Sequence, residues 1–292
     1  MNRRRPPRIN KTEPGETSPS VSGGKPRRGK ERGDTSAPKQ STPSGRERLY
    51  GITPVEGALR AGKRKIFRIL VKEGRHSPRL EEVIDLARDR AIPLEVTSPT
   101  NLEQLAGSGT HQGIVADCGA LPLGSEKDAL NWEPSPTDDG QARSSLLIAL
   151  DEIQDPQNLG AVVRNAAVFG ATGVVLPRNH SAPLSPAASK ASAGWLEQFP
   201  LYDAPNLARF LDAAKKAGFW IAGTDQDGNT PLETFTNDQP LVLVLGNEGR
   251  GLRSLVREKC DFTLAIPTQG EGGLNVSSAS AVLLYQLTLN RK

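Results

Sequence analysis

Two loops rich in glycine and small polar residues carry the clearest chemical signal in this 292-residue chain. One loop, residues 266–280, separates a strand-like apolar run from a helix-like apolar run. The other, residues 246–252, directly follows a second apolar run at 241–245. Because parallel strands present their carboxyl ends at one edge of an α/β sheet, we expect both loops to border a single ligand pocket.

A third polar segment follows the apolar run at 146–150. In it Asn158 and Arg164 lie six residues apart, with Gly160 between them. This spacing places them near the amino end of a helix, at the carboxyl end of a strand, where polar ligand groups bind in such sheets. Asp155 or Asn158 could equally cap the helix, with Arg164 solvated, so this segment alone does not indicate a site.

Taken together, the three segments resemble the SpoU (TrmH/RlmB-like) branch of the SPOUT RNA 2'-O-ribose methyltransferases. The first motif, Asp-Pro-x-Asn-x-Gly followed by an arginine, matches residues 155–160 and Arg164. The second, Gly-x-Glu-x-x-Gly, matches residues 246–251. The third, Ile-Pro, a glycine-bearing loop and Leu-Asn-Val-Ser, matches residues 266–277. The motifs stand in family order, and the resemblance covers about residues 146–290.

The resemblance implies a fold that periodicity alone would not suggest. The catalytic domain would be an α/β domain with a mostly parallel sheet and a deep trefoil knot, an arrangement otherwise nearly absent from proteins. The segment before it, residues 49–121, resembles the small L30e-like RNA-binding domain that precedes the catalytic domain in RlmB-type enzymes. Members of the family are homodimers, so the resemblance implies a dimer that uses helices near 158–169 and 279–289.

The resemblance also implies S-adenosylmethionine as cofactor and methyl transfer to a ribose 2'-hydroxyl. By position, the cofactor contacts would come mainly from the backbone of Gly246, Ile266 and Leu274, with Thr224 as a further contact. No metal is required. A sulfonium methyl is already a strong electrophile, so the enzyme must hold the 2'-oxygen in line with it and manage the departing proton.

The implied catalytic residues are Arg164, Asn158, Glu248 and Asn275. A guanidinium stays protonated, which makes Arg164 a poor literal base. We expect Arg164 to grip the adjacent phosphate and stabilise developing alkoxide charge, while the other three orient Arg164, the nucleotide and the loops.

The third motif departs from the family pattern in two ways. This chain has Gly273 where the family typically has serine before Leu-Asn, and the loop is one residue shorter than usual. Because that loop shapes the cofactor and ribose pockets, its contacts should differ from those of relatives, and these changes could mean weak activity.

Charge is concentrated at the amino terminus. Residues 1–48 contain 13 Lys/Arg and 5 Asp/Glu, a net charge of +8 within a chain whose total is +4. This segment has too few apolar residues to bury a core, so we expect it to be disordered. It could bind rRNA or tRNA through phosphates, or serve only as a solvated linker. A second basic cluster, formed by Lys63, Arg64, Lys65 and Arg68, could likewise contact RNA or simply be solvated.

The apolar pattern predicts the elements that position these residues. Helical and strand-like segments alternate from 49 to 120 and predict a small α/β sandwich. Residues 121–144 are polar and proline-rich and read as a linker. Residues 145–292 form a second α/β unit whose strands are apolar on both sides, which indicates a parallel sheet covered by helices.

Composition excludes several other classes. No stretch reaches the roughly 20 apolar residues of a membrane span, and the first 20 residues lack a signal-peptide core. The two cysteines, Cys118 and Cys260, are far apart, which argues against disulfides and zinc and fits a reducing cytoplasm. The three histidines are too scattered for a metal site.

These observations leave a ranked set of functions. The first is methylation of guanosine ribose in 23S rRNA, because the two-domain layout resembles RlmB-type enzymes, and a tRNA substrate is the nearest alternative. A different class is an RNA-binding or ribosome-assembly factor of the same fold with weak or lost transfer, suggested by Gly273 and the short loop. A nucleotide-dependent oxidoreductase ranks last, because neither GxGxxG after a first strand nor GxxxxGK[ST] occurs.

Overall fold

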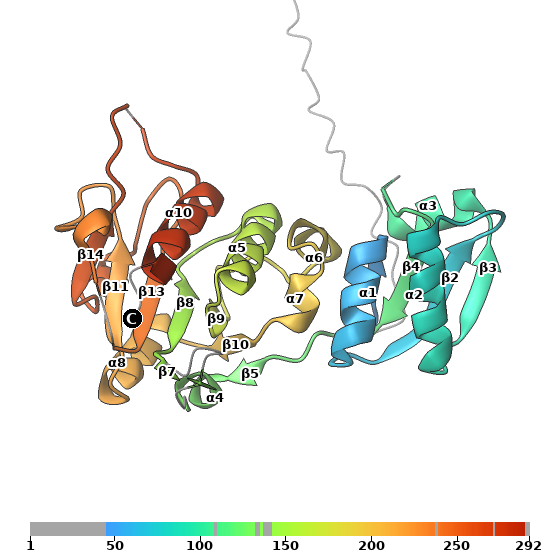
Figure 1. Cartoon of the computed structure of the whole chain (residues 1–292), viewed down its shortest axis with the longest axis horizontal. Coiled ribbons are helices and arrows are strands. Elements are labelled where there is room, and N and C mark those ends of the chain that lie inside the picture. Colours follow the sequence, from blue (N-terminus) through green and yellow to red (C-terminus); the bar gives the residue numbers. More distant parts are fainter. Residues whose placement is uncertain are drawn as a thin grey trace, which may run out of the picture. The chain divides into compact units, whose positions relative to one another are not determined.

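The computed structural model describes residues 45–107, 110–131, 135–136, 142–236, 239–270 and 272–289. Residues 40–292 form one unit, and within it two sheets are each covered by helices (Figure 1). We call residues 45–121 the small domain and residues 124–289 the large domain. Most of the predicted basic tail, residues 1–44, lies outside the described residues.

The small domain contains a four-stranded sheet in the order β1-β4-β2-β3. Its strands are β1 (Glu47–Tyr50), β2 (Ile66–Lys72), β3 (Leu94–Thr97) and β4 (Ile114–Cys118). Helices α1 (Ile52–Ala61) and α2 (Pro78–Asp89) cover one face, and α3 (Pro99–Ala106) covers the other. Side chains of β2 point alternately to the two faces of the sheet. Ile69 and Val71 pack with α1 and α2, whereas Leu70 packs with α3.

Helix α1 begins at a cap supplied by a distant residue. Gly51 has φ 94° and no side chain, so it cannot cap the helix itself. The side-chain oxygen of Gln112 instead accepts a hydrogen bond from the Ile52 N–H at 3.0 Å. At the other end, Gly62 adopts the left-handed conformation and its N–H donates to the Ala58 carbonyl.

The large domain contains an eight-stranded sheet in the order β12-β14-β11-β13-β8-β9-β10-β5, in which all neighbours pair in parallel. The strands are β5 (Gly124–Ser125), β8 (Leu146–Leu150), β9 (Gly173–Pro177), β10 (Leu201–Ala204), β11 (Trp220–Thr224), β12 (Thr230–Pro231), β13 (Leu241–Leu245) and β14 (Phe262–Ala265). A separate two-stranded sheet joins β6 (Ser135–Pro136) and β7 (Ala142–Arg143).

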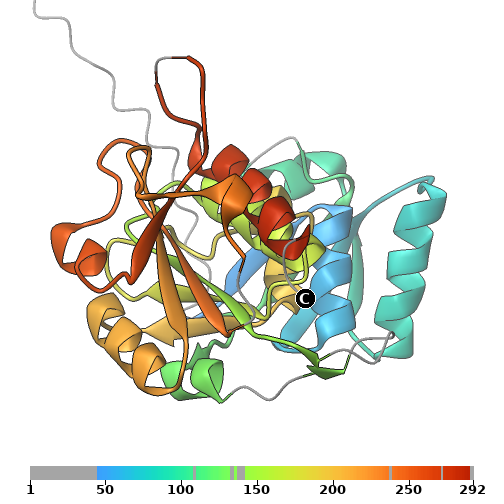
Figure 2. The ribbon, with the colours of Figure 1, turned by 60° about the vertical axis from the view of Figure 1, so that its left-hand side comes forward.

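Helices cover both faces of the large sheet. One face packs against α5 (Pro156–Val168), α6 (Pro186–Ala191), α7 (Trp195–Gln198), α10 (Val276–Leu289) and the 3-10 turn η1 (Leu232–Thr234). The other face packs against α4 (Glu126–Leu130), α8 (Leu207–Lys216) and α9 (Ser254–Arg257). Helix α10, in red, lies beside α5 (Figure 2), and the Thr288 hydroxyl donates to the Phe169 carbonyl at 2.9 Å.

The predicted α/β class and the mostly parallel sheet are confirmed, but some elements differ from the prediction. Strand β1 begins two residues before Leu49, and β10 was not predicted. Strand β10 is short and interrupted by Asp203, so it gives no apolar run. Within the segment predicted as a linker, 121–144, β5 pairs with β10 and α4 packs on the large sheet.

Two glycines make room for an aromatic ring at this pairing. The Tyr202 ring of β10 lies against Gly124 of β5 and Gly173 of β9, where added Cβ atoms would lie 2.7 Å from Cδ1 and 3.1 Å from Cδ2. Both neighbouring strands therefore need glycine beside this ring.

No helix in the described part of the chain is long and apolar enough to cross a membrane.

Candidate active site

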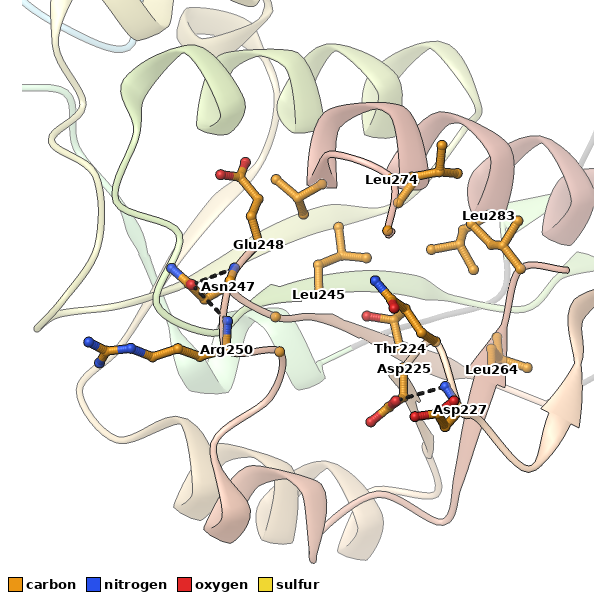
Figure 3. A pocket seen from close by; sticks show the side chains of 18 of the residues that line it. Thr224, Asp225, Asp227, Leu245, Asn247, Glu248, Arg250, Leu264, Leu274 and Leu283 are labelled. Atoms are coloured by element: carbon orange, nitrogen blue, oxygen red, sulfur yellow. Dashed lines mark hydrogen bonds between the residues drawn. The ribbon is translucent and has the colours of Figure 1, made fainter. Parts of the chain in front are cut away.

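A cavity of about 410 Å³ lies at the carboxyl ends of β11, β13 and β14. The loops that follow these three strands and the beginning of α10 form its wall. Figure 3 shows Thr224, Leu245 and Leu274 bordering the cavity from three different segments. The glycine-rich loops at 246–252 and 266–275 thus meet at one pocket, as their positions after parallel strands predict.

All four residues predicted to contact a cofactor line this cavity: Thr224, Gly246, Ile266 and Leu274. Thr224 is the last residue of β11 rather than part of the following loop, and its hydroxyl donates to the Val244 carbonyl at 3.1 Å. This bond ties β11 to β13 at the floor of the pocket.

The loop after β13 is a tight turn held by Asn247. Its backbone exchanges hydrogen bonds with Gly251 at 3.0 and 2.8 Å, and its side-chain oxygen accepts from the N–H groups of Gly249 and Arg250 (Figure 3). A Cβ added to Gly246 would lie 2.5 Å from the Gly251 carbonyl carbon. Glycine at 246 is therefore required by the close approach of backbone, and the turn presents a fixed surface to the cavity.

Three of the four predicted catalytic side chains meet beside the cavity. The Oε1 atom of Glu248 accepts hydrogen bonds from the amide of Asn158 and, at 3.0 Å, from the amide of Asn275. The two asparagines are also joined, since the Asn275 amide lies 3.3 Å from Asn158 Oδ1. Each residue comes from a different motif, so this triangle holds the three loops together.

The two asparagines of the triangle are held in place at the starts of helices. Asp155 caps α5 by accepting from the Gln157 N–H, so Asn158 is not the cap and its amide is free to bond Glu248. Asn275 immediately precedes α10, and its Oδ1 accepts from the Ser277 N–H at 2.8 Å. Asn275 therefore both starts α10 and bonds Glu248, which ties the third loop to the second.

Arg164 lies apart from this triangle. It is on α5, six residues after Asn158, which puts the two side chains about 120° apart around the helix axis. Asn158 is buried whereas Arg164 is exposed. Among the described residues, Arg164 makes no hydrogen bond or ion pair through its side chain, which leaves its charge available to a ligand.

Two ion pairs next to the cavity were not predicted. Asp151, at the end of β8, is fully buried and accepts from the backbone N–H and the Nε of Arg253 at 2.8 and 2.7 Å. Asp225, after β11, pairs with Arg257 at 2.6 Å. The sequence does contain a signal for these ion pairs. Each aspartate comes directly after an apolar strand, and both arginines lie in the segment after the second loop.

The basic cluster of the small domain is largely used in internal contacts. Lys63 donates to the carbonyls of Gln198 and Phe199 at 2.6 and 3.0 Å, and burial lowers the pKa of Lys63 against the opposing effect of Glu197. The Arg64 side chain is only 1% exposed and pairs with the fully buried Glu197 at 2.8 Å. Arg64 is therefore not at the surface where RNA could reach it.

Solvent reaches the other two members of the cluster, as it also reaches the exposed Lys63. Arg68 is 36% exposed and pairs with Asp117 and Glu95, both at 2.8 Å. Lys65 is exposed, and its ammonium lies 5.2 Å from the centre of the Phe67 ring. The prediction of RNA contact is thus geometrically open for Lys65 and Arg68.

Neither cysteine is placed for nucleophilic chemistry. Burial raises the pKa of both thiols, to about 11 for Cys260. At neutral pH both are therefore protonated, which is the unreactive form.

Within the described part of the chain, no group of three or more His, Cys, Asp or Glu side chains could hold a metal ion.

Comparison with known proteins identifies the two domains. The SpoU rRNA Methylase family matches residues 145–285, and the family described as RNA 2'-O ribose methyltransferase substrate binding matches residues 48–123. The 23S rRNA (guanosine-2'-O-)-methyltransferase RlmB of Pseudomonas aeruginosa is 35% identical over 249 residues, covering 84% of this chain and 97% of the relative. The putative TrmH family tRNA/rRNA methyltransferase YacO of Bacillus subtilis is 33% identical, covering 78% and 90%.

Solved structures share the fold. The SpoU methyltransferase AviRb from Streptomyces viridochromogenes superposes with a TM-score of 0.70 at 25% identity, covering 85% of this chain and 90% of AviRb. A structure of AviRb with AdoMet superposes with a TM-score of 0.69 at 24% identity, covering 84% and 90%. The matched family models and the similarity to RlmB over nearly its whole length show that this chain belongs to the SpoU rRNA methylase family.

Proposed function

We propose that the protein transfers a methyl group from S-adenosylmethionine to the ribose 2'-hydroxyl of a guanosine in 23S rRNA. The observation that carries this proposal is the cavity, because all four residues predicted for the cofactor line it and the Asn158–Glu248–Asn275 triangle lies beside it. The target is proposed from the curated relatives named 23S rRNA (guanosine-2'-O-)-methyltransferase, which this chain covers over 96–97% of their length.

The cavity fits S-adenosylmethionine in size and charge. Its volume falls within the range of about 300–1,000 Å³ for small-molecule sites. Asp225, Asp227 and Glu248 line it against Arg250 and Arg257, which leaves one excess negative charge. When bound, S-adenosylmethionine supplies a positively charged sulfonium with a reactive methyl group. An acidic lining attracts such a cation, while Gly246 lets the backbone approach it closely.

The chain's own residues would orient the ribose and manage charge. Glu248, held by Asn158 and Asn275, fixes the wall of the pocket next to the reacting hydroxyl. Arg164 is exposed and unpaired among the described residues, so it can bind an RNA phosphate and stabilise the developing alkoxide. The proton then leaves to phosphate or water, because a guanidinium cannot accept it.

We also propose a homodimer. Val168 of α5 and Val282, Tyr285 and Leu289 of α10 are exposed large apolar or aromatic side chains on two adjacent helices. Such a patch is costly in water and suits burial against a second copy. We further propose that the three loops form a trefoil knot. We also propose that the protein is located in the cytoplasm, with its RNA substrate.

For RNA contact, we propose Lys65 and Arg68 on the small domain, together with the basic segment at 1–48. Lys63 and Arg64 are assigned to internal contacts instead, because of their partners Gln198, Phe199 and Glu197. Deleting residues 1–44 should weaken RNA binding at low salt more than at high salt. An unchanged salt dependence would show that this segment is a passive linker.

Methylation assays test the proposal directly. Purified protein and S-adenosylmethionine should methylate 23S rRNA from cells that lack the gene, at one guanosine ribose, and should not methylate tRNA. Transfer to tRNA alone would favour the alternative suggested by the YacO relative. If the protein does not bind S-adenosylmethionine at millimolar concentration in a calorimetric titration, the alternative of a binding or assembly factor would replace the enzyme.

A further inference from the structure

Helix α1 of the small domain carries a buried glycine, Gly57, in its interior. Glycine weakens a helix relative to alanine, so its presence there needs a reason. A Cβ added to Gly57 would lie 2.6 Å from the carbonyl oxygen of Gly194, the residue that precedes α7 of the large domain. A Cβ added to Gly194 would lie 2.5 Å from the carbonyl oxygen of Thr53 in α1. Both obstructing atoms belong to the backbone, so a side chain at either glycine requires the two helices to move apart.

A buried ion pair joins the two domains in the same region. Arg64 follows α1 and its Nε lies 2.8 Å from Oε2 of Glu197 in α7, with side chains that are 1% and 0% exposed. The Ser189 hydroxyl of α6 donates to Oε1 of the same carboxylate at 2.9 Å. Because a buried charge that loses its partner is unfavourable, the domains can stay in contact only in an orientation that keeps this pair together.

Two lysines add contacts at either side of the ion pair. The Lys63 ammonium donates to the carbonyls of Gln198 and Phe199 at 2.6 and 3.0 Å. The Lys190 ammonium of α6 donates to the Thr110 carbonyl, in the segment before β4, at 3.4 Å. The small domain is thus held through α1, the segment after α1 and the segment before β4, and contacts at three separate segments oppose rotation about any one of them.

We propose that Gly57, Gly194, Arg64 and Glu197 are positioning residues for the RNA: they hold the small domain against the large domain in one orientation, so that RNA bound by the small domain reaches the cavity at a fixed place. The inference rests on the proposed function, in which the small domain binds the RNA substrate. Two binding surfaces that are held rigidly together engage one ligand with less loss of conformational freedom than two surfaces that move independently.

Gly57→Ala in the full-length protein tests the contact. Alanine should stabilise an isolated helix, whereas here its Cβ would lie 2.6 Å from a backbone oxygen of the large domain. We therefore expect the melting temperature to fall, by about 5 °C. In methylation assays the KM for 23S rRNA should rise about tenfold, because the two RNA-binding surfaces lose their fixed relation. The kcat at saturating RNA and the dissociation constant of S-adenosylmethionine should stay unchanged, because Gly57 does not line the cavity.

Val55→Ala serves as the matched control. Val55 lies on the same helix and is fully buried in the core of the small domain. Its truncation should lower the melting temperature to a similar extent, since it leaves a cavity in that core. The KM for 23S rRNA should stay unchanged, because no atom is added between the domains. A rise in KM confined to Gly57→Ala is a result that loss of stability alone would not produce.

The outcomes separate this proposal from the proposed function. An unchanged or raised melting temperature for Gly57→Ala would show that the domains are not held together in solution and would overturn the positioning role. An unchanged KM for Gly57→Ala, or an equal rise for Val55→Ala, would overturn it as well. Failure of the unmodified protein to methylate 23S rRNA would instead overturn the proposed function, while the melting temperatures would still test the contact between the domains.

Discussion

Asp151 provides a sharp test of how the second loop is held. Its carboxylate is fully buried at the end of β8 and binds Arg253 twice, at the backbone N–H and at Nε. Arg253 directly follows the turn that lines the cavity. Asp151→Ala removes both bonds and leaves the segment after the turn without its anchor.

The expected cost follows from the burial of each group. A hydrogen bond to a charged group contributes about 1.5–3 kcal/mol. The Arg253 side chain is 43% exposed, so water can replace much of its bond and that share is only about 0–1 kcal/mol. The loss of the backbone bond dominates, and Asp151→Ala should lower the free energy of unfolding by about 1.5–4 kcal/mol. Asp151→Asn keeps an acceptor for the backbone N–H and should cost about half as much.

Urea denaturation measures these values, and calorimetry should show weaker binding of S-adenosylmethionine because the turn at 246–252 loses its tether. The matched control is Asp85→Ala, which removes an exposed pair with Arg88 whose side chains are 65% and 61% exposed. That substitution should cost less than about 0.5 kcal/mol. Equal unfolding free energies for Asp151→Ala and Asp85→Ala would refute the reasoning.

Three further predictions concern other parts of the chain. Arg64→Ala strands the buried Glu197 carboxylate and should destabilise the protein by about 3–5 kcal/mol in urea unfolding, with partial recovery on adding Glu197→Ala; wild-type stability would contradict this. Because the pKa of Cys260 is raised to about 11, its alkylation by iodoacetamide in the folded protein should rise about tenfold per pH unit from pH 8 to 10, and a plateau near pH 9 would count against it. Gly246→Ala should abolish detectable binding of S-adenosylmethionine in calorimetry, since its Cβ would lie 2.5 Å from the Gly251 carbonyl carbon; unchanged affinity would disprove the close approach.

The pocket could be located from sequence because its signal is local. The loops at 246–252 and 266–275 each follow an apolar strand, so the carboxyl edge of a parallel sheet brings them together without knowledge of side-chain packing. The individual cofactor residues Thr224, Gly246, Ile266 and Leu274 were implied by the family resemblance. The triangle of Asn158, Glu248 and Asn275 required the family resemblance as well, because nothing in their spacing shows that three amide and carboxylate groups will converge.

The features that could not be predicted depend on distant partners. Arg64 reads as one of four neighbouring basic residues, and its burial is decided by Glu197, 133 residues later. Strand β10 has an aspartate in a short run, and its place in the sheet depends on glycines in β5 and β9 beside Tyr202. In both cases the deciding contact joins segments whose pairing no local pattern encodes.

The pairing of β5 with β10 has a practical consequence for dissecting this protein. Residues 124–125 look like part of a dispensable connection, yet they cover the outer edge of the large sheet. A fragment that starts at residue 145 would leave the backbone groups of β10 unpaired and open to strand-to-strand association with other molecules. Such a fragment is expected to aggregate, whereas one that begins before Leu121 would keep its sheet edge protected. For dissecting the protein, residues 124–125 are therefore best kept with the large sheet that they pair with.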